Sequence, residues 1–161
     1  MTTRKLSILV TFIAFSIVGA MIKIPAVISS IALDSFPALA GSVLLGPVAG
    51  AIIGALGHLG SAFLGGLPLG PLHLLVAVEM AVIVFVFGYL YRSNKRMLAY
   101  SFFLISNGFV AAIPFGFIIS WSFYVAFLPP LLIGTAVNLV IAIVALPRIQ
   151  QATNVVLRRN A

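Results

Sequence analysis

The chain has 161 residues, of which 63% are hydrophobic and only 7% are charged. A soluble domain needs more polar residues to cover its surface, so this composition predicts an integral membrane protein without a soluble nucleotide-binding domain. The formal net charge is +7, but the cations stand at the ends of apolar segments rather than in a basic run with aromatic residues, so we predict no nucleic-acid partner. The absence of cysteine excludes disulfides, thiol nucleophiles and zinc–cysteine sites.

The first apolar segment, residues 6–22, follows Arg4 and Lys5. A basic start before an apolar run is also typical of a signal peptide, but no clean small-x-small cleavage site follows, and we expect a retained spanning helix. Ser16, Gly19 and Ala20 give this helix a smooth face of small residues.

Further apolar segments of about 20 residues, long enough to cross a membrane, cover 72–91, 97–117 and about 128–147. Residues 35–64 are apolar throughout but contain Gly46-Pro47. Because proline cannot donate to the helix ladder and glycine eases a break, this segment is either one helix or two short helices. The first alternative gives five spans and the second gives six.

The charges decide between these counts. The loop 92–96 holds three cations, and short loops rich in Lys and Arg are cytoplasmic. Only six spans place this loop on the same side as Arg4 and Lys5. We therefore predict an all-α membrane protein with six transmembrane helices, a single transmembrane domain over 1–161, and both termini cytoplasmic.

The same topology places the loops 23–35, 65–71 and 118–127 outside. Residues 35–45 are too few to cross the hydrocarbon at about 1.5 Å per residue, so the second helix must either be short and shielded by its neighbours or begin before residue 35.

Four polar side chains interrupt the predicted spans at a similar depth, roughly 10–15 Å below the outer surface: His58, Glu79, Asn107 and Asn138. Glu79 is the only glutamate of the chain. An acidic residue near the centre of a spanning helix costs about 2.5–3.5 kcal/mol on insertion, so such residues usually face a cavity or a partner. The common depth of these four groups in the membrane predicts a binding site. The alternative is that they pair with one another and hold the bundle together.

Other candidates for substrate contact lie nearer the outer surface: Asp34, His73, Trp121 and Tyr124. Trp121, Tyr124 and Phe123 would form an aromatic rim, whereas His73 could instead simply mark the membrane interface. The histidines and Glu79 lack a ligand spacing such as His-Glu-x-x-His, and no serine-nucleophile motif or phosphate loop is present. We therefore predict no enzymatic activity, no metal and no cofactor.

Three motifs follow one another in a fixed order: Lys23-Ile24-Pro25, then Asp-x-x-Pro from Asp34 to Pro37, then Leu-x-Gly-Pro-x-x-Gly-x-x-x-Gly from Leu44 to Gly54. With the chain length and the six helices, they resemble the substrate-binding S components of energy-coupling factor (ECF) vitamin transporters. The resemblance covers nearly the whole chain.

The resemblance implies a multi-pass protein of a bacterial cell membrane, surrounded by lipid, that binds a vitamin or vitamin precursor near the outer face. Its partners would be a transmembrane coupling subunit and two cytosolic ATPases. Docking would use small residues of the first helix. The family motif there is Ala-x-x-x-Ala, for which this chain has Ser16 and Ala20 with Gly19 beside them.

The sequences around His58, His73 and Glu79 look most like S components for α-ribazole and related cobalamin precursors. Thiamine precursors, queuosine precursors and biotin remain open, although anions fit less well because only Lys23 lies near the mouth of the site. Two other classes remain: a proton-coupled secondary carrier that uses Glu79, for which we find no inverted repeat, and a non-transporting membrane assembly factor.

Overall fold

The computed structural model describes residues 3–21, 23–25, 30–32 and 34–159. Helices account for most of this part of the chain. Their bounds, with two short strands and two 3₁₀ turns, are α1 (Thr3–Met21), β1 (Lys23–Pro25), β2 (Ser30–Ala32), α2 (Ser35–Leu45), α3 (Pro47–Leu64), η1 (Gly70–Leu72), α4 (His73–Arg92), α5 (Arg96–Gly108), η2 (Val110–Ala112), α6 (Ile113–Ile118) and α7 (Trp121–Arg159).

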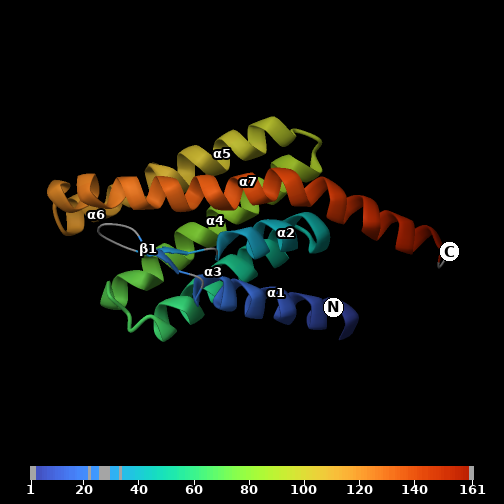
Figure 1. The fold of residues 1–161 in the computed structure, drawn as a ribbon, viewed down its shortest axis with the longest axis horizontal. Coiled ribbons are helices and arrows are strands. Elements are labelled where there is room, and N and C mark those ends of the chain that lie inside the picture. Colours follow the sequence, from blue (N-terminus) through green and yellow to red (C-terminus); the bar gives the residue numbers. More distant parts are fainter. Residues whose placement is uncertain (1–2, 22, 26–29, 33, 160–161) are drawn as a thin grey trace.

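The long helices run side by side in alternating directions, and both termini lie at the same end of the bundle (Figure 1). The turn between α4 and α5 lies at that end as well. Within the described ranges, five helical segments are long and apolar enough to cross a membrane: Thr3–Met21, Pro47–Leu64, Gly70–Arg92, Arg96–Ile118 and Trp121–Ala152. With α2 as an additional short helix, the chain passes along the bundle an even number of times, which agrees with termini on one side.

The predicted break at Gly46-Pro47 is confirmed, because α2 ends at Leu45 and α3 begins at Pro47. Gly46 alone separates the two helices, with φ 111° and ψ 163°. A side chain rarely adopts this backbone conformation, so the reversal needs glycine. Pro47 then occupies the first turn of α3, where its missing N–H leaves no hydrogen bond unmade.

The short helix α2 is enclosed by its neighbours, as its length requires. Eight of its eleven residues are buried, and it packs against α1, α3, α4 and α7. At about 1.5 Å per residue it is only about 16 Å long, roughly half the hydrocarbon thickness. It therefore fills the bundle over one half of its length only.

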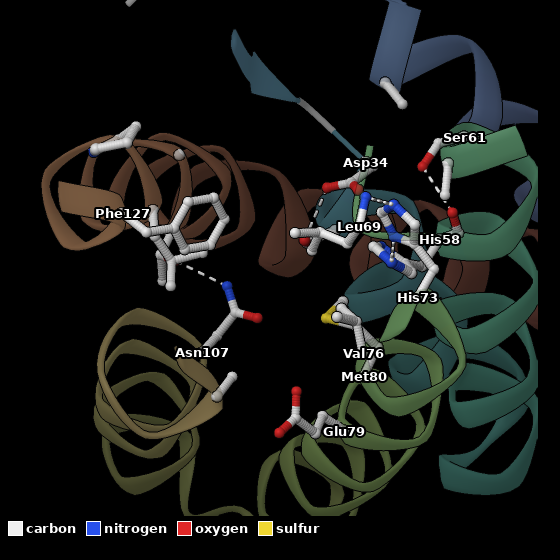
Figure 2. Close-up of a pocket in the computed structure, with 18 of the residues that line it drawn as sticks. Asp34, His58, Ser61, Leu69, His73, Val76, Glu79, Met80, Asn107 and Phe127 are labelled. Carbon is white, nitrogen blue, oxygen red and sulfur yellow. Dashed lines mark hydrogen bonds between the residues drawn. The ribbon is translucent and has the colours of Figure 1, made fainter. Parts of the chain in front are cut away.

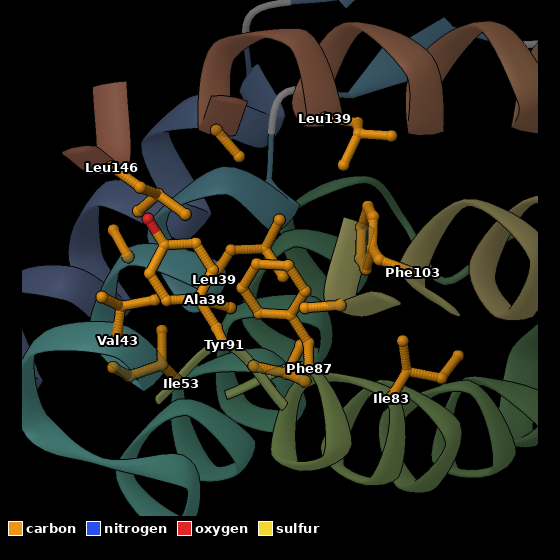
Figure 3. Close-up of a cluster of buried hydrophobic side chains, with 14 of the residues drawn as sticks. Ala38, Leu39, Val43, Ile53, Ile83, Phe87, Tyr91, Phe103, Leu139 and Leu146 are labelled. Atoms are coloured by element: carbon orange, nitrogen blue, oxygen red, sulfur yellow. The ribbon is translucent and has the colours of Figure 1, made fainter. Parts of the chain in front are cut away.

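That half contains the hydrophobic core (Figure 3). The core combines α2 with the facing sides of α3, α4, α5 and α7, and its largest fully buried side chains include Leu39, Ile53, Phe87, Phe103 and Leu146. Glycines permit the close contacts there. A Cβ added at Gly88 would lie 2.8 Å from the Ser42 Cβ, so α4 approaches α2 at a distance that only glycine allows.

Side chains from other helices hold both ends of α2. Near the start, the Asn138 Oδ1 of α7 accepts a hydrogen bond from the Phe36 backbone N–H at 2.9 Å. At the other end, Arg92 of α4 donates to the Val43 carbonyl at 2.8 Å. The first N–H groups and the last carbonyls of a helix have no intrahelical partner, so these two bonds satisfy groups that would otherwise stay unpaired inside the membrane.

Several boundaries differ from the sequence-based expectations. The loop predicted at 118–127 is wrong, because α7 begins at Trp121 and continues through Pro129 and Pro130. Spanning helices tolerate proline where neighbouring groups satisfy the freed carbonyls. The helix predicted over 97–117 is interrupted after Gly108 by η2, and the antiparallel pairing of β1 with β2 was not expected.

Candidate functional site

A cavity of about 500 Å³ opens between α3, α4, α5 and α7, at the end of the bundle away from the termini (Figure 2). Asp34 and Ser35 at the start of α2 also line it. Small-molecule sites usually enclose about 300–1,000 Å³, so the volume suits a small organic ligand. The cavity lies along the bundle axis beyond the start of α2, in the half of the bundle that α2 does not fill, and the start of α2 forms its floor.

Glu79 and Asn107 face each other across this cavity (Figure 2). The Glu79 Oε2 is buried and has no hydrogen-bond partner among the described residues. The Asn107 Nδ2 donates to the Thr135 Oγ1 of α7 at 2.7 Å, which fixes the direction of the amide. The predicted alternative of direct pairing between Glu79 and a polar neighbour is not what the described residues show.

His58 and His73 form a pair at the wall of the cavity. The His58 Nε2 lies 3.1 Å from the His73 Nδ1, and the His73 Nε2 accepts from the Leu69 backbone N–H at 3.3 Å. A neutral His73 that accepts at Nε2 carries its proton on Nδ1 and donates it to His58. In this arrangement the proton of His58 is on Nδ1. The two hydrogen bonds hold the segment between α3 and α4 against the side of the cavity.

Asn138 and Asp34 lie at the floor of the cavity, near the start of α2. Both line the cavity, but Asn138 uses its Oδ1 on Phe36 and donates its Nδ2 to the Gly134 carbonyl at 2.9 Å. Asp34 accepts a hydrogen bond from Ser35 at its Oδ1 (3.0 Å), and its own carbonyl accepts from Ser16 at 2.6 Å. Asn138 thus matches the predicted alternative of a group that holds the bundle together.

The aromatic wall shares Phe123 with the predicted rim, and its other members differ from the prediction. Phe115, Phe123 and Phe127 line the cavity, whereas Trp121 and Tyr124, both in the described part of the chain, do not. Phe123 and Phe127 stack with their ring centroids 5.5 Å apart. Residues four apart lie on one face of a helix. In the sequence-based prediction these two lie in a loop, so their shared face could be recognised only if the helix began near Trp121.

The small-residue face predicted for α1 is largely internal. Ser16 is 1% and Ala20 is 8% exposed, and Gly19 is partly exposed. A Cβ added at Gly57 of α3 would lie 2.6 Å from the Ser16 Cβ, so Ser16 packs directly against α3. Ser16 and Ala20 therefore cannot form an exposed docking surface, which corrects the predicted register on this helix.

Lys23, expected near the mouth, has only its backbone described, in β1; its side chain lies outside the described residues. Across the described chain, no group of three or more His, Asp or Glu side chains is arranged to hold a metal ion.

The sequence matches the family model described as ECF transporter, substrate-specific component, over residues 4–156. Comparisons with curated proteins and with solved structures gave no match. The family match spans nearly the whole chain, including every helix that borders the cavity. The chain therefore belongs to the family of substrate-specific components of ECF transporters.

Proposed function

We propose that this protein captures a vitamin or vitamin precursor in the cavity above α2 and delivers it inward with a coupling subunit and two ATPases. The observation that carries the proposal is the cavity itself, in a member of this family: about 500 Å³, mostly apolar, with a few polar groups that converge from several helices. Substrate sites in proteins have this composition.

The charges support an outward-facing cavity. Arg92, Lys95 and Arg96 lie at the turn that shares its end of the bundle with both termini. Loops rich in Lys and Arg remain in the cytoplasm, which supports an orientation with the opposite end, and the cavity, outside. Cysteines introduced at Ser93 and Ser122 should react with an impermeant reagent from opposite sides, Ser93 from the cytosol. Reaction from one side would contradict this orientation.

Among substrates, we favour α-ribazole or a related cobalamin precursor. A neutral riboside of an apolar bicyclic base offers an aromatic surface for Phe123 and Phe127 and hydroxyls for Glu79 and Asn107. Mass spectrometry of small molecules that copurify with the protein tests this choice. Recovery of a thiamine or queuosine precursor would change the substrate and leave the transport role intact.

For docking to the coupling subunit, we propose the exposed face of α1 in place of the buried one. This face carries exposed residues at intervals of three or four positions: Ser7, Thr11, Ala14 and Val18. The Ser7 and Thr11 hydroxyls donate to carbonyls of their own helix, so the face is smooth and lets another helix approach closely.

The substitution Ala14→Trp tests this face. It should lower uptake by the assembled transporter and leave substrate binding by the isolated subunit unchanged. Val140→Trp, on an exposed position of α7, is the matched control and should leave both unchanged. Equal losses from the two variants would contradict docking through α1.

Uptake itself separates this function from that of a proton-coupled carrier. Uptake should require the coupling subunit and the ATPases, and it should survive collapse of the proton gradient while ATP is held constant. Accumulation by the subunit alone in liposomes, driven by protons, would overturn the proposal and give Glu79 a coupling role.

A further inference from the structure

The polar groups of the cavity are distributed unequally, and their chemistry restricts the ligand. Glu79 lies on α4 with its carboxylate directed into the open space toward Asn107 (Figure 2). Its Oε2 is buried and receives no hydrogen bond within the described chain. A buried carboxylate oxygen without a donor is unfavourable, and this oxygen is placed to accept a hydrogen bond from a molecule in the cavity.

Asn107 adds a second acceptor. Because its Nδ2 donates to the Thr135 Oγ1 at 2.7 Å, its amide oxygen turns toward the cavity (Figure 2). Asn138 differs in this respect, since both its amide oxygen and its amide nitrogen already bond to backbone groups. An ionised carboxylate and an amide oxygen are both acceptors, so Glu79 and Asn107 together form an end of the cavity that accepts hydrogen bonds; we name this pair the acceptor end.

Among the Asp, Glu, Lys and Arg residues of the described chain, only acidic ones line the cavity. Its lining includes the carboxyl groups of Asp34 and Glu79, and no Lys or Arg of the described chain lines it. A phosphate or carboxylate brought to the acceptor end would meet a like charge in a medium of low dielectric, where repulsion is strong. Amino, amidine, amide N–H and hydroxyl groups would instead complete the unmade hydrogen bonds.

We propose that the acceptor end selects an uncharged or cationic ligand that presents at least two hydrogen-bond donors to Glu79 and Asn107, and that it rejects ligands with an anionic group there. The inference rests on the proposed function and adds the chemical class of the substrate. The apolar body of the ligand would lie against Phe123 and Phe127, which line the same cavity.

The test uses pairs of probes that differ by one anionic group, with the purified full-length protein in lipid nanodiscs. The pairs are α-ribazole with α-ribazole 5′-phosphate, thiamine with thiamine monophosphate, and nicotinamide with nicotinate. We expect at least one uncharged or cationic member to bind, and its anionic counterpart to bind at least about 10-fold more weakly, because a like-charge contact replaces a charge-assisted bond.

Glu79→Gln keeps the shape of the side chain and replaces an acceptor with a donor. This substitution should weaken binding of that probe by roughly 10- to 150-fold, the equivalent of a lost charge-assisted hydrogen bond. It should also reduce the difference in affinity between the probe and its anionic counterpart. Val78→Ala, the neighbouring exposed position of α4, is the matched control and should change neither.

Three results would overturn the proposal: preferential binding of an anionic member, an affinity that Glu79→Gln leaves unchanged, or a panel in which no donor-bearing member binds. Each is separable from a failure of the transport function, which is judged by uptake that depends on the coupling subunit and the ATPases. A protein that supports such uptake but prefers anionic probes would retain its function and lose the acceptor end.

Discussion

The two halves of the bundle share the same long helices and differ in what lies between them. In the half near the termini, α2 fills the centre and is surrounded by fully buried side chains such as Leu39 and Phe87. In the other half, the continuation of α2 is missing and a cavity of about 500 Å³ takes its place. The comparison teaches that a membrane bundle gains a binding site when one helix is short, without distortion of the others.

The dense half should tolerate no added volume. At Gly50 an added Cβ would overlap the Ser42 Cβ and lie 2.6 Å from the Ser42 Cα, which is backbone and cannot turn away. Gly50→Val should therefore lower the free energy of unfolding by roughly 3 kcal/mol or more, in the range of severe overpacking. Ile52→Val, on an exposed position of the same helix, is the control. Thermal unfolding in detergent measures both, and a normal midpoint for Gly50→Val would contradict the close approach of α2 and α3.

The boundary between the halves depends on Asn138. Asn138→Leu removes the acceptor for the Phe36 N–H and leaves a buried donor unpaired, which should lower stability by about 1–3 kcal/mol. Asn138→Asp retains the acceptor oxygen and should lose less. Thermal unfolding of the ligand-free variants gives the comparison; equal midpoints for Leu and Asp would show that this bond does not hold α2.

One pair of identical substitutions contrasts the two halves directly. Ala40 of α2 is completely buried in the dense half, and Ala111 lines the cavity. Ala40→Leu should destabilise by about 1–3 kcal/mol through overpacking, whereas Ala111→Leu should leave the midpoint of the ligand-free protein unchanged and weaken binding because it takes up part of the cavity. Equal destabilisation by both substitutions would indicate that the outer half is as densely packed as the inner half.

The smallest effect is expected at Tyr124, a sequence-based candidate that does not line the cavity. Tyr124→Phe should change the free energy of unfolding by less than about 0.5 kcal/mol. It should not change the amount of small molecule that copurifies with the protein. Phe127→Ala, which removes part of the cavity wall, is the positive comparison and should reduce retention. A marked loss of binding in Tyr124→Phe would return this residue to the site.

Local signals explain what the sequence revealed. The break at Gly46-Pro47 follows from the chemistry of two adjacent residues, so it needed no knowledge of the neighbours. The common depth of His58, Glu79 and Asn107 follows from counting residues along apolar helices, and all three line the cavity.

The remaining features depend on contacts between distant segments. No local pattern indicates that Asn138 bonds to Phe36, 102 residues earlier in the chain, or that Ser16 packs on Gly57 rather than facing outward. The start of α7 was misplaced because Pro129 and Pro130 are typical of a helix beginning, whereas the structure contains both inside a longer helix.

The length of α2 also constrains how the chain enters the membrane during synthesis. Eleven residues give the insertion machinery too little apolar length for separate recognition, and Gly46 alone joins α2 to α3, so the two segments must enter together as a helical hairpin. The side chain that holds the start of α2 comes from α7, which is synthesised after α1 to α6. The floor of the cavity is therefore completed only after α7 has been made, and a chain without α7 cannot hold substrate.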